Sequence, residues 1–355
     1  MTETLRIGIL GAGWAGASHA VAYAQLPNVA VTALWSRTRA RAAALAAHLQ
    51  QSGLRVYDHW QDLIEQGEVD VISVATPPML RREPVEMALF RGRHLLVEKP
   101  MSVGVADAQA MVTAAGAAQT VTATCFNWRY APAYQVAWRA VREGQIGALR
   151  DVRTEWRIRA TTRDFFVARP WMTRMDIANG ALGEGLAHDF DKARFLTGSE
   201  FTRMVSRITP VTIKQDGDYL IDGGRSAHLA ELTGGVLGGF YMTPTAGQDE
   251  WRLTLIGDEG SLLITDAGQH ITRQRADDDQ PVALAIPASD QAPAGTDMMQ
   301  HIWNRLIADF VQAIRRGDVA HRSVPHLPTL TDGLRSEEII AAARASDASG
   351  CWVAV

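Results

Sequence analysis

Apolar runs alternate with helical stretches over roughly the first third of the chain. Leu5–Leu10 is a short apolar run, and the glycines after it lead into an alanine-rich stretch that predicts a helix from about Ala15 to Gln25. Val29–Trp35 and Val69–Ala75 are further apolar runs with the composition of buried strands. Strands that alternate with helices of this length predict a parallel, doubly wound sheet with right-handed crossovers.

The same alternation extends to residue 125. It predicts, in order, a helix over 37–50, a helix near Pro84–Arg91, a strand at His94–Val97, a helix at Val105–Ala115 and a strand at Thr120–Cys125. We therefore assign residues 1–125 to a first domain of the α/β class.

After about Asn127 the pattern changes to polar and apolar residues that alternate with a period of two, which indicates antiparallel strands with one buried face. The alternating segments are Leu149–Arg159, Met204–Lys214, Ala227–Tyr241 and Trp251–Ile264. Helices are predicted at Pro132–Glu143, Gly183–Leu196, Met299–Arg316 and Thr331–Ala345. We assign residues 126–355 to a second, α+β domain with a large and mainly antiparallel sheet.

Composition and charge exclude several classes of protein. With 355 residues, 47% of them hydrophobic, the chain has enough apolar surface for two cores, which excludes a disordered protein. A net charge of -4 without a basic block argues against a nucleic-acid partner. No apolar run approaches the length of a membrane span, and the N-terminus lacks the pattern of a signal peptide, so we expect a cytoplasmic protein.

Two residue types are scarce. The two cysteines, Cys125 and Cys351, are too few for a disulfide framework or a cysteine metal cluster, so we predict no metal site. The only lysines are Lys99, Lys192 and Lys214, whereas the other 32 of the 35 basic residues are arginine. A buried ammonium can lose its proton near neutral pH and a guanidinium cannot, which makes these lysines candidates for chemistry, with chance as the alternative.

A glycine-rich turn follows the first predicted strand and opens the first predicted helix. Such a turn cradles a pyrophosphate at a helix N-terminus, and its three glycines permit the tight turn, the close approach of the ligand and the packing of helix on strand. A lone GxGxxG is often chance, but the strand and helix around this one predict a Rossmann domain. The residues assigned to the cofactor are Gly11, Gly13, Trp14, Ala15 and Gly16.

The end of the second predicted strand distinguishes NAD from NADP. An acidic residue there would hydrogen-bond the ribose of NAD, but this chain has Ser36 and Arg37. A hydroxyl and a guanidinium suit a 2′-phosphate, so the sequence favours NADP, with NAD possible. The alternative is that Ser36 caps a helix and Arg37 is a solvated arginine.

Seven motifs together resemble the Gfo/Idh/MocA family, which is named after glucose-fructose oxidoreductase, inositol dehydrogenase and a rhizopine-catabolism protein. They extend over nearly the whole chain: GILGAGWAG, VDVISVATPP, VEKP, FNWRYAPA, GALGEGLAHDFD, GDEGSL and DGLRSEEIIAAARAS. The resemblance implies that Lys99 reaches the substrate beside the nicotinamide and that Glu184 and His188 line the same pocket. Residues four apart share one face of a helix, which independently allows Glu184 and His188 to converge.

The resemblance also places further residues. It implies cofactor contacts at Thr76, Pro77, Glu98, Lys99, Asn127 and Arg129. Asp191 matches the family pattern on the substrate side. Two positions depart from the family, which usually has aspartate at Glu184 and often histidine at Arg81. We also expect Arg163 and Trp171 to contact substrate, with a β-edge of solvated arginines and core aromatics as the alternative.

The resemblance implies an NAD(P)-dependent oxidoreductase that acts on a sugar, a cyclitol or a related polyol. His188 is assigned as the proton acceptor with Lys99 polarising the same oxygen, and the reverse assignment stays open. Lys192 either extends the active face or has a structural role. Two other functions compete, an NAD-dependent glycosidase of the same family and a non-catalytic dinucleotide-sensing regulator. The resemblance further implies a homodimer or homotetramer.

Overall fold

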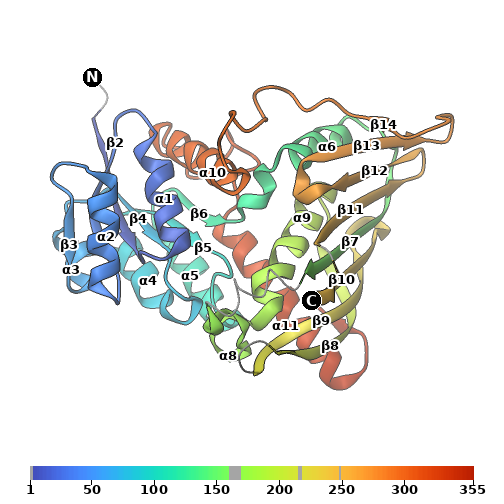
Figure 1. Ribbon diagram of the computed structural model, residues 1–355, viewed down its shortest axis with the longest axis horizontal. Coiled ribbons are helices and arrows are strands. Elements are labelled where there is room, and N and C mark those ends of the chain that lie inside the picture. The colour runs from blue at the N-terminus through green and yellow to red at the C-terminus, as the bar shows by residue number, and fades with distance from the viewer. Residues whose placement is uncertain (1–2, 160–168, 215–217, 248) are drawn as a thin grey trace. The chain divides into compact units, whose positions relative to one another are not determined.

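The chain divides into two compact units, each described here by itself. The computed structural model describes residues 3–159, 169–214, 218–247 and 249–355 (Figure 1). Unit 1 comprises Met1–Asn127 and Pro293–Arg335, and unit 2 comprises Trp128–Ala292 and Ser336–Val355. Among the described residues, no helix has both the length and the apolarity that crossing a bilayer requires.

Unit 1 contains a six-stranded parallel sheet in the order β3-β2-β1-β4-β5-β6. This is the strand order of the Rossmann fold, in which ligands bind where the order reverses, between β1 and β4. The central strands are buried on both faces and therefore consist of near-continuous apolar runs, as the sequence predicted. The strands are β1 (Leu5–Leu10), β2 (Val29–Trp35), β3 (Arg55–Tyr57), β4 (Val71–Val74), β5 (His94–Glu98) and β6 (Thr122–Cys125).

The helices of unit 1 follow the predicted alternation, with one pair of elements that the sequence did not indicate. That pair, β3 and α3 (Trp60–Gln66), has only three and seven residues, which is too short for a readable period. The other helices are α1 (Trp14–Ala24), α2 (Arg39–Leu49), α4 (Arg82–Phe90), α5 (Val105–Ala117) and α10 (Met298–Arg315).

The stretch Pro293–Arg335 returns to unit 1, so the second unit is not the contiguous range 126–355. In this stretch α10 packs against α1 (Figure 1), and Gln300 Nε2 donates to the carbonyl of Ser18 at 3.0 Å. Arg315 Nη2 likewise donates to the carbonyl of Pro27 at 2.5 Å. An amphipathic helix pattern shows that one face is buried but does not show against what, so this return could not be foreseen.

Unit 2 contains a nine-stranded sheet in the order β14-β13-β12-β11-β7-β10-β9-β8-β15. Its neighbouring strands pair antiparallel, except that β7 and β10 are parallel, which agrees with the prediction of a mainly antiparallel sheet. The strands are β7 (Leu149–Arg159), β8 (Phe201–Lys214), β9 (Asp218–Leu232), β10 (Leu237–Ala246), β11 (Glu250–Gly257), β12 (Gly260–Thr265), β13 (His270–Arg275), β14 (Val282–Ala283) and β15 (Val353–Ala354).

Two of the alternating segments each contain a turn that the period-two pattern concealed. Ala227–Tyr241 is divided by the turn Thr233–Gly235 into the ends of β9 and β10, and Trp251–Ile264 is divided at Asp258 and Glu259. Gly234 and Gly235 have φ of 76° and 79°, a conformation that glycine adopts at little cost. A hairpin can keep the alternation in step across its turn, so hydrophobic period alone did not separate these strands.

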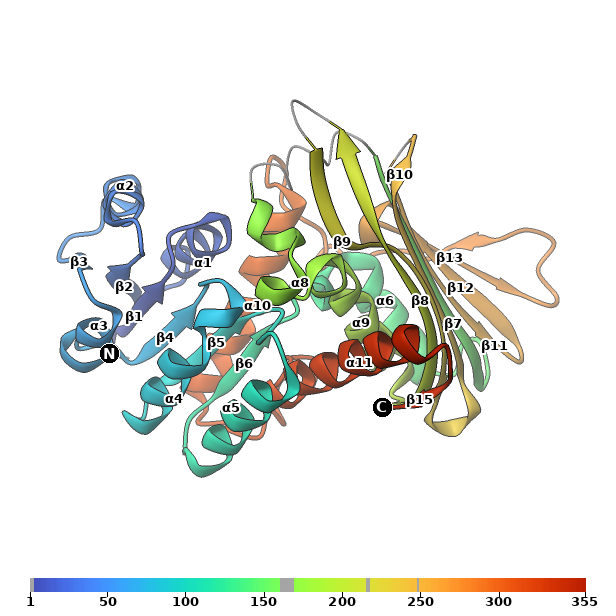
Figure 2. The same ribbon diagram turned by 90° about the horizontal axis from the view of Figure 1, so that it is seen from below.

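Helices cover one face of this sheet, and no helix that the structure describes lies on the other face, called here the open face. Figure 2 shows α6 (Pro132–Arg142) and α9 (Ala187–Thr197) on the covered side, where Phe190 packs edge-on against Phe201 and Phe240. Helix α11 (Leu330–Ser349) begins in unit 1 and ends in unit 2, where Ser346 Oγ accepts from the backbone of Ser206 at 2.9 Å.

Candidate active site

The glycine-rich turn joins β1 to α1 and requires glycine at two of its three positions. Gly11 has a φ of +109°, and a Cβ there would lie 2.6 Å from the carbonyl oxygen of Ala75. A Cβ on Gly16 would lie 1.8 Å from the carbonyl oxygen of Gly11. The first glycine therefore makes the turn and the third lets α1 approach it, as the motif predicted.

The second glycine and a neighbouring hydroxyl suit a bound dinucleotide. Gly13 is exposed, a Cβ there would meet open space, and it is the N-cap of α1, the end of a helix that suits an anion. Thr76, which follows β4, buries its Oγ1 without a hydrogen bond to any described residue. A pyrophosphate at the helix N-terminus and a polar cofactor atom near Thr76 would satisfy both groups.

The residues after β2 bear on the choice between NAD and NADP. Ser36 is half-buried, and Arg37 is exposed without an ion pair to any residue that the structure describes. Arg39, by contrast, pairs with Asp58 at 2.8 Å. Thr38 is the N-cap of α2, so the alternative in which Ser36 caps this helix is wrong.

Glu98, at the end of β5, is the centre of a buried polar cluster that the sequence did not reveal. Its Oε1 lies 3.1 Å from His19 Nε2 and accepts from Trp303 Nε1 at 3.3 Å, and its Oε2 accepts from the backbone N–H of Lys99 at 3.0 Å. Burial raises the pKa of Glu98, but the His19 hydrogen bond and the charges of His19, Lys99 and Arg81 outweigh burial and lower it to about 2.

His19 and Cys125 belong to the same cluster. His19 Nδ1 lies 2.8 Å from Ser73 Oγ, and Cys125 Sγ lies 3.7 Å from His19 Nε2. The ligand atoms of His19, Glu98 and Cys125 are all within 4.8 Å of one another, a spacing compatible with a metal ion. Burial raises the pKa of the Cys125 thiol. In this structure the contacts of the cluster are hydrogen bonds between buried side chains.

Lys99 is half-buried and follows β5, at the sheet edge where ligands bind in this fold. It belongs to unit 1, as do Pro77, Glu98 and the glycine turn. Glu184, His188, Arg129, Asp191 and Trp171 belong to unit 2, and Asn127 is the last residue of the first segment of unit 1. Arg163 lies outside the described residues. Convergence of Lys99 with Glu184 and His188 is part of the proposal below.

Glu184 lies in a π-helical turn, Leu182–Leu186, which leads directly into α9, and not in the uniform helix predicted over Gly183–Leu196. π-helical turns are rare in proteins overall, and those that do occur often lie at functional sites. The Trp156 ring explains the neighbouring glycine, because a Cβ on Gly185 would lie 1.4 Å from an atom of that ring. His188 is buried in the first turn of α9.

A group of tryptophans lies beside His188. The rings of Trp128 and His188 are 6.3 Å apart and meet edge to face. Trp251 contacts both Trp128, at 4.6 Å between ring centroids, and Trp156, at 5.2 Å. Trp171, in the short helix Pro170–Thr173, is half-buried. Aromatic faces of this kind pack well against the C–H faces of sugar rings.

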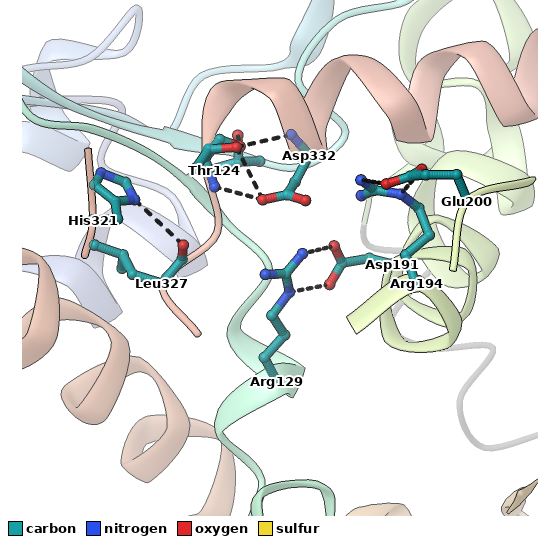
Figure 3. A network of polar contacts seen from close by, with 9 residues as sticks. Thr124, Arg129, Asp191, Arg194, Glu200, His321, Leu327 and Asp332 are labelled. Carbon is teal, nitrogen blue, oxygen red and sulfur yellow. Dashed lines mark hydrogen bonds and ion pairs between the residues drawn. The ribbon is translucent and has the colours of Figure 1, made fainter. Parts of the chain in front are cut away.

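Arg129 and Asp191 form a buried ion pair with two parallel hydrogen bonds, of 2.8 and 2.5 Å (Figure 3). The sequence predicted a cofactor contact for Arg129 and a substrate contact for Asp191. The structure joins the two side chains to each other, and Arg129 also lies over the ring of Phe195, 5.1 Å from its centroid. The two ligand contacts stay predictions. This bidentate pair fixes α9 to the segment that precedes α6.

Lys192 is buried and paired, which favours the structural alternative for this residue. Its Nζ lies 2.6 Å from Asp189 Oδ1 and 3.3 Å from Tyr134 Oη. Burial lowers the pKa of Lys192, but Asp189 and Tyr134 outweigh burial and raise it. An ammonium held in this way stays charged, so it is a poor proton acceptor.

The carboxylate of Glu98 leads to a prediction about acid stability. Because its pKa in the folded protein is about 2, below the ordinary 4.5, it stabilises the fold above pH 4.5 and loses this contribution as the pH falls towards 2. Glu98→Gln should lower the free energy of unfolding at pH 7 by about 3 kcal/mol and make it less dependent on pH below 4.5. Urea unfolding over a pH series measures both effects.

The matched control is Glu86→Gln, because Glu86 carries an exposed i,i+4 ion pair with Arg82. That change should alter the free energy of unfolding by less than about 0.5 kcal/mol. If the free energy of unfolding changed equally with pH in the parent and in Glu98→Gln, the buried Glu98 would not be ionised in the folded protein.

Two family models match the chain. A model described as an oxidoreductase family with an NAD-binding Rossmann fold matches residues 5–125, and a model of the GFO/IDH/MocA C-terminal domain matches residues 134–263. Together they include more than two thirds of the chain.

Two curated relatives illustrate the similarity. Levoglucosan dehydrogenase from Pseudarthrobacter phenanthrenivorans is 29% identical over 203 residues, which are 55% of this chain and 52% of the dehydrogenase, so this match spans about half of that protein. A dTDP-3,4-didehydro-2,6-dideoxy-alpha-D-glucose 3-reductase from Streptomyces violaceoruber is 29% identical over 328 residues, which are 89% of this chain and 87% of the reductase.

Solved structures show the same fold over the full length. An oxidoreductase domain protein from Kribbella flavida has a TM-score of 0.86 at 26% identity, with 100% of both chains covered. A complex of levoglucosan dehydrogenase with NADH and L-sorbose has a TM-score of 0.87 at 23% identity, with 100% of this chain and 99% of that chain covered, and supports the fold alone. The chain therefore belongs to the Gfo/Idh/MocA family of oxidoreductases, as its motifs predicted.

Proposed function

We propose that this oxidoreductase transfers a hydride between a nicotinamide dinucleotide and a secondary alcohol or ketone of a sugar, cyclitol or related polyol. The observation that carries the proposal is Lys99, a half-buried lysine at the ligand-binding edge of the Rossmann sheet, in the same unit as the glycine turn. The names of the relatives, which are a sugar dehydrogenase and a sugar-nucleotide reductase, support the substrate class.

The dinucleotide, when bound, supplies the hydride acceptor or donor at C4 of its nicotinamide ring. In oxidation His188 accepts the proton of the substrate hydroxyl, Lys99 stabilises the developing charge on the same oxygen, and Glu184 orients the two. The tryptophans beside His188 exclude water and offer apolar faces to a sugar ring. We also propose substrate contacts for Trp171 and Arg163, while Asp191 and Arg129 support the site through their ion pair.

Cofactor preference follows from Ser36 and Arg37. We propose NADP as the preferred cofactor, because the exposed guanidinium of Arg37 has no partner among the described residues and no carboxylate follows β2 to repel a 2′-phosphate. The solved levoglucosan dehydrogenase complex contains NADH, so the preference is a property to be measured on this chain.

NADP(H) should bind at least about tenfold more tightly than NAD(H), a difference of roughly 1.4 kcal/mol. Ser36→Asp should reverse the preference, because its carboxylate repels the 2′-phosphate and can accept from a ribose hydroxyl. Fluorescence titration with both dinucleotides measures the two constants. Equal or tighter NAD(H) binding by the parent protein would refute the assignment.

Lys99→Arg tests the proposed chemistry. A panel of sugars, cyclitols and keto-sugars, followed by nicotinamide absorbance, should identify a substrate with steady-state turnover of free dinucleotide. With that substrate Lys99→Arg should lower turnover by at least about a hundredfold, near 2.7 kcal/mol, because a guanidinium is wider than an ammonium and stays charged. Cofactor affinity should change little.

Lys214→Arg, the same exchange at the end of β8, is the control and should retain parental turnover. A Lys99→Arg enzyme within about threefold of the parent would remove Lys99 from the mechanism. Glycoside cleavage without net turnover of free dinucleotide would instead establish the glycosidase alternative, and binding without either reaction would establish the regulator.

The open face of the unit 2 sheet supports the expected homodimer or homotetramer. Leu229, Leu237 and Tyr241 are 60%, 53% and 38% exposed on adjacent strands, where they form an apolar strip beside a hollow of about 640 Å³. Alternating charges continue across the same face, with Arg157 bridging Glu155 and Glu250. A strip of apolar residues flanked by charges of both signs suits a second copy of the same face.

Leu229→Asp should shift the protein towards the monomer, because it places a charge in the apolar strip. Phe90→Asp is the matched control, since Phe90 is 83% exposed on α4 of unit 1 and should not affect association. Sedimentation velocity over a range of concentrations measures both. A parent protein that stays monomeric, or a Leu229→Asp variant that associates like the parent, would rule out this interface.

A further inference from the structure

Arg81 is a buried arginine that the mechanism above does not use. It lies between the turn Pro78–Leu80 and α4, and only 3% of its surface is exposed. A guanidinium at this depth is costly unless hydrogen bonds replace its water. The structure provides carbonyl acceptors. Arg81 Nε donates to the carbonyl of Thr76 at 2.7 Å, and Nη1 donates to the carbonyls of both Glu98 and Pro100.

The two carbonyls that share Nη1 belong to the residues on either side of Lys99. Arg81 therefore restrains the backbone immediately before and after this lysine. The third carbonyl, that of Thr76, belongs to the residue whose buried Oγ1 lacks a partner among the described residues. One planar side chain thus ties the end of β4, which faces the cofactor turn, to the end of β5, which carries Lys99.

Only arginine has the donor geometry for this arrangement. Its guanidinium offers five N–H groups in a rigid plane and remains charged, whereas a lysine presents one ammonium and a neutral imidazole donates from one nitrogen. The positive charge of Arg81 also lies close enough to contribute to the low pKa of Glu98.

We propose that Arg81 is a positioning residue that sets the backbone from which Lys99 projects and couples it to Thr76, beside the glycine turn. The inference rests on the proposed role of Lys99. A purely structural role would also make Arg81 important for stability, because its buried hydrogen bonds join the ends of two strands of unit 1. A positioning role predicts a slower hydride transfer that does not follow from lost stability, whereas a purely structural role predicts that rate and stability fall together.

Arg81→Ala and Arg81→Lys are compared with Arg82→Ala, whose side chain is half-exposed and pairs with Glu86 and Asp107. With saturating cofactor and substrate, single-turnover hydride transfer should fall at least about thirtyfold in Arg81→Ala and about tenfold in Arg81→Lys. Arg82→Ala should stay within about twofold of the parent. Dinucleotide dissociation constants and thermal unfolding are measured for each variant.

Added guanidinium tests positioning directly, because a purely structural role predicts no recovery of the hydride-transfer rate without a gain in stability. In Arg81→Ala the vacated space should admit guanidinium ion at concentrations far below those that denature, and the transfer rate should recover at least about fivefold, while methylammonium should not restore it. Thermal stability should not rise in parallel. Loss of rate that follows loss of stability, without rescue by guanidinium, would overturn the inference.

A double-mutant cycle separates this inference from the proposed function. If Arg81 acts through Lys99, Arg81→Ala should cost less than about threefold in a Lys99→Met background. Retention of activity by Lys99→Met would overturn the role of Lys99 and with it the inference. If Lys99→Met lost hydride transfer while Arg81→Lys kept the parental rate, only the inference about Arg81 would be overturned. This outcome does not depend on whether Arg81→Ala folds.

Discussion

Glu98 places an ionised carboxylate inside unit 1, where three donors from separate elements meet it. His19 comes from α1, Trp303 comes from α10, and the backbone N–H of Lys99 follows β5. An ion at this depth is tolerated only when its hydrogen bonds are satisfied, so these elements must keep their mutual positions for the carboxylate to stay ionised. The helix that begins in the glycine turn is thereby tied to the strand that carries the candidate catalytic lysine.

In unit 2, too, buried charges with satisfied hydrogen bonds join separate elements. The bidentate pair of Arg129 and Asp191 and the buried contact of Lys192 with Asp189 both fix α9, the helix whose first turn carries His188. Before this helix, the Trp156 ring occupies the space that a side chain on residue 185 would need, and the chain adopts a π-helical turn at Glu184. Ion pairs and aromatic packing therefore fix helix α9 and the turn before it, which carry the two candidate catalytic residues of unit 2.

The roles of several charged residues follow from this arrangement. Arg129 and Asp191, which sequence motifs assign to ligands, also form an ion pair with each other. Arg81, a departure from the family pattern, contacts the backbone on both sides of Lys99. Motif matching proposes which region of the chain forms the site. It does not distinguish a residue that touches the substrate from one that holds such a residue in place.

The sequence by itself determined the parallel sheet, the glycine turn, the antiparallel second half and the family, because each is a local pattern of period or spacing. Only the tertiary structure decided that Pro293–Arg335 packs on unit 1, that Ala227–Tyr241 contains a turn, and that His19 meets Glu98 across 79 positions. Periodicity shows which face of an element is buried but not its partner. Buried polar contacts between distant residues leave no periodic trace, and the partners of His19, Arg81 and Arg129 could be found only in the folded chain.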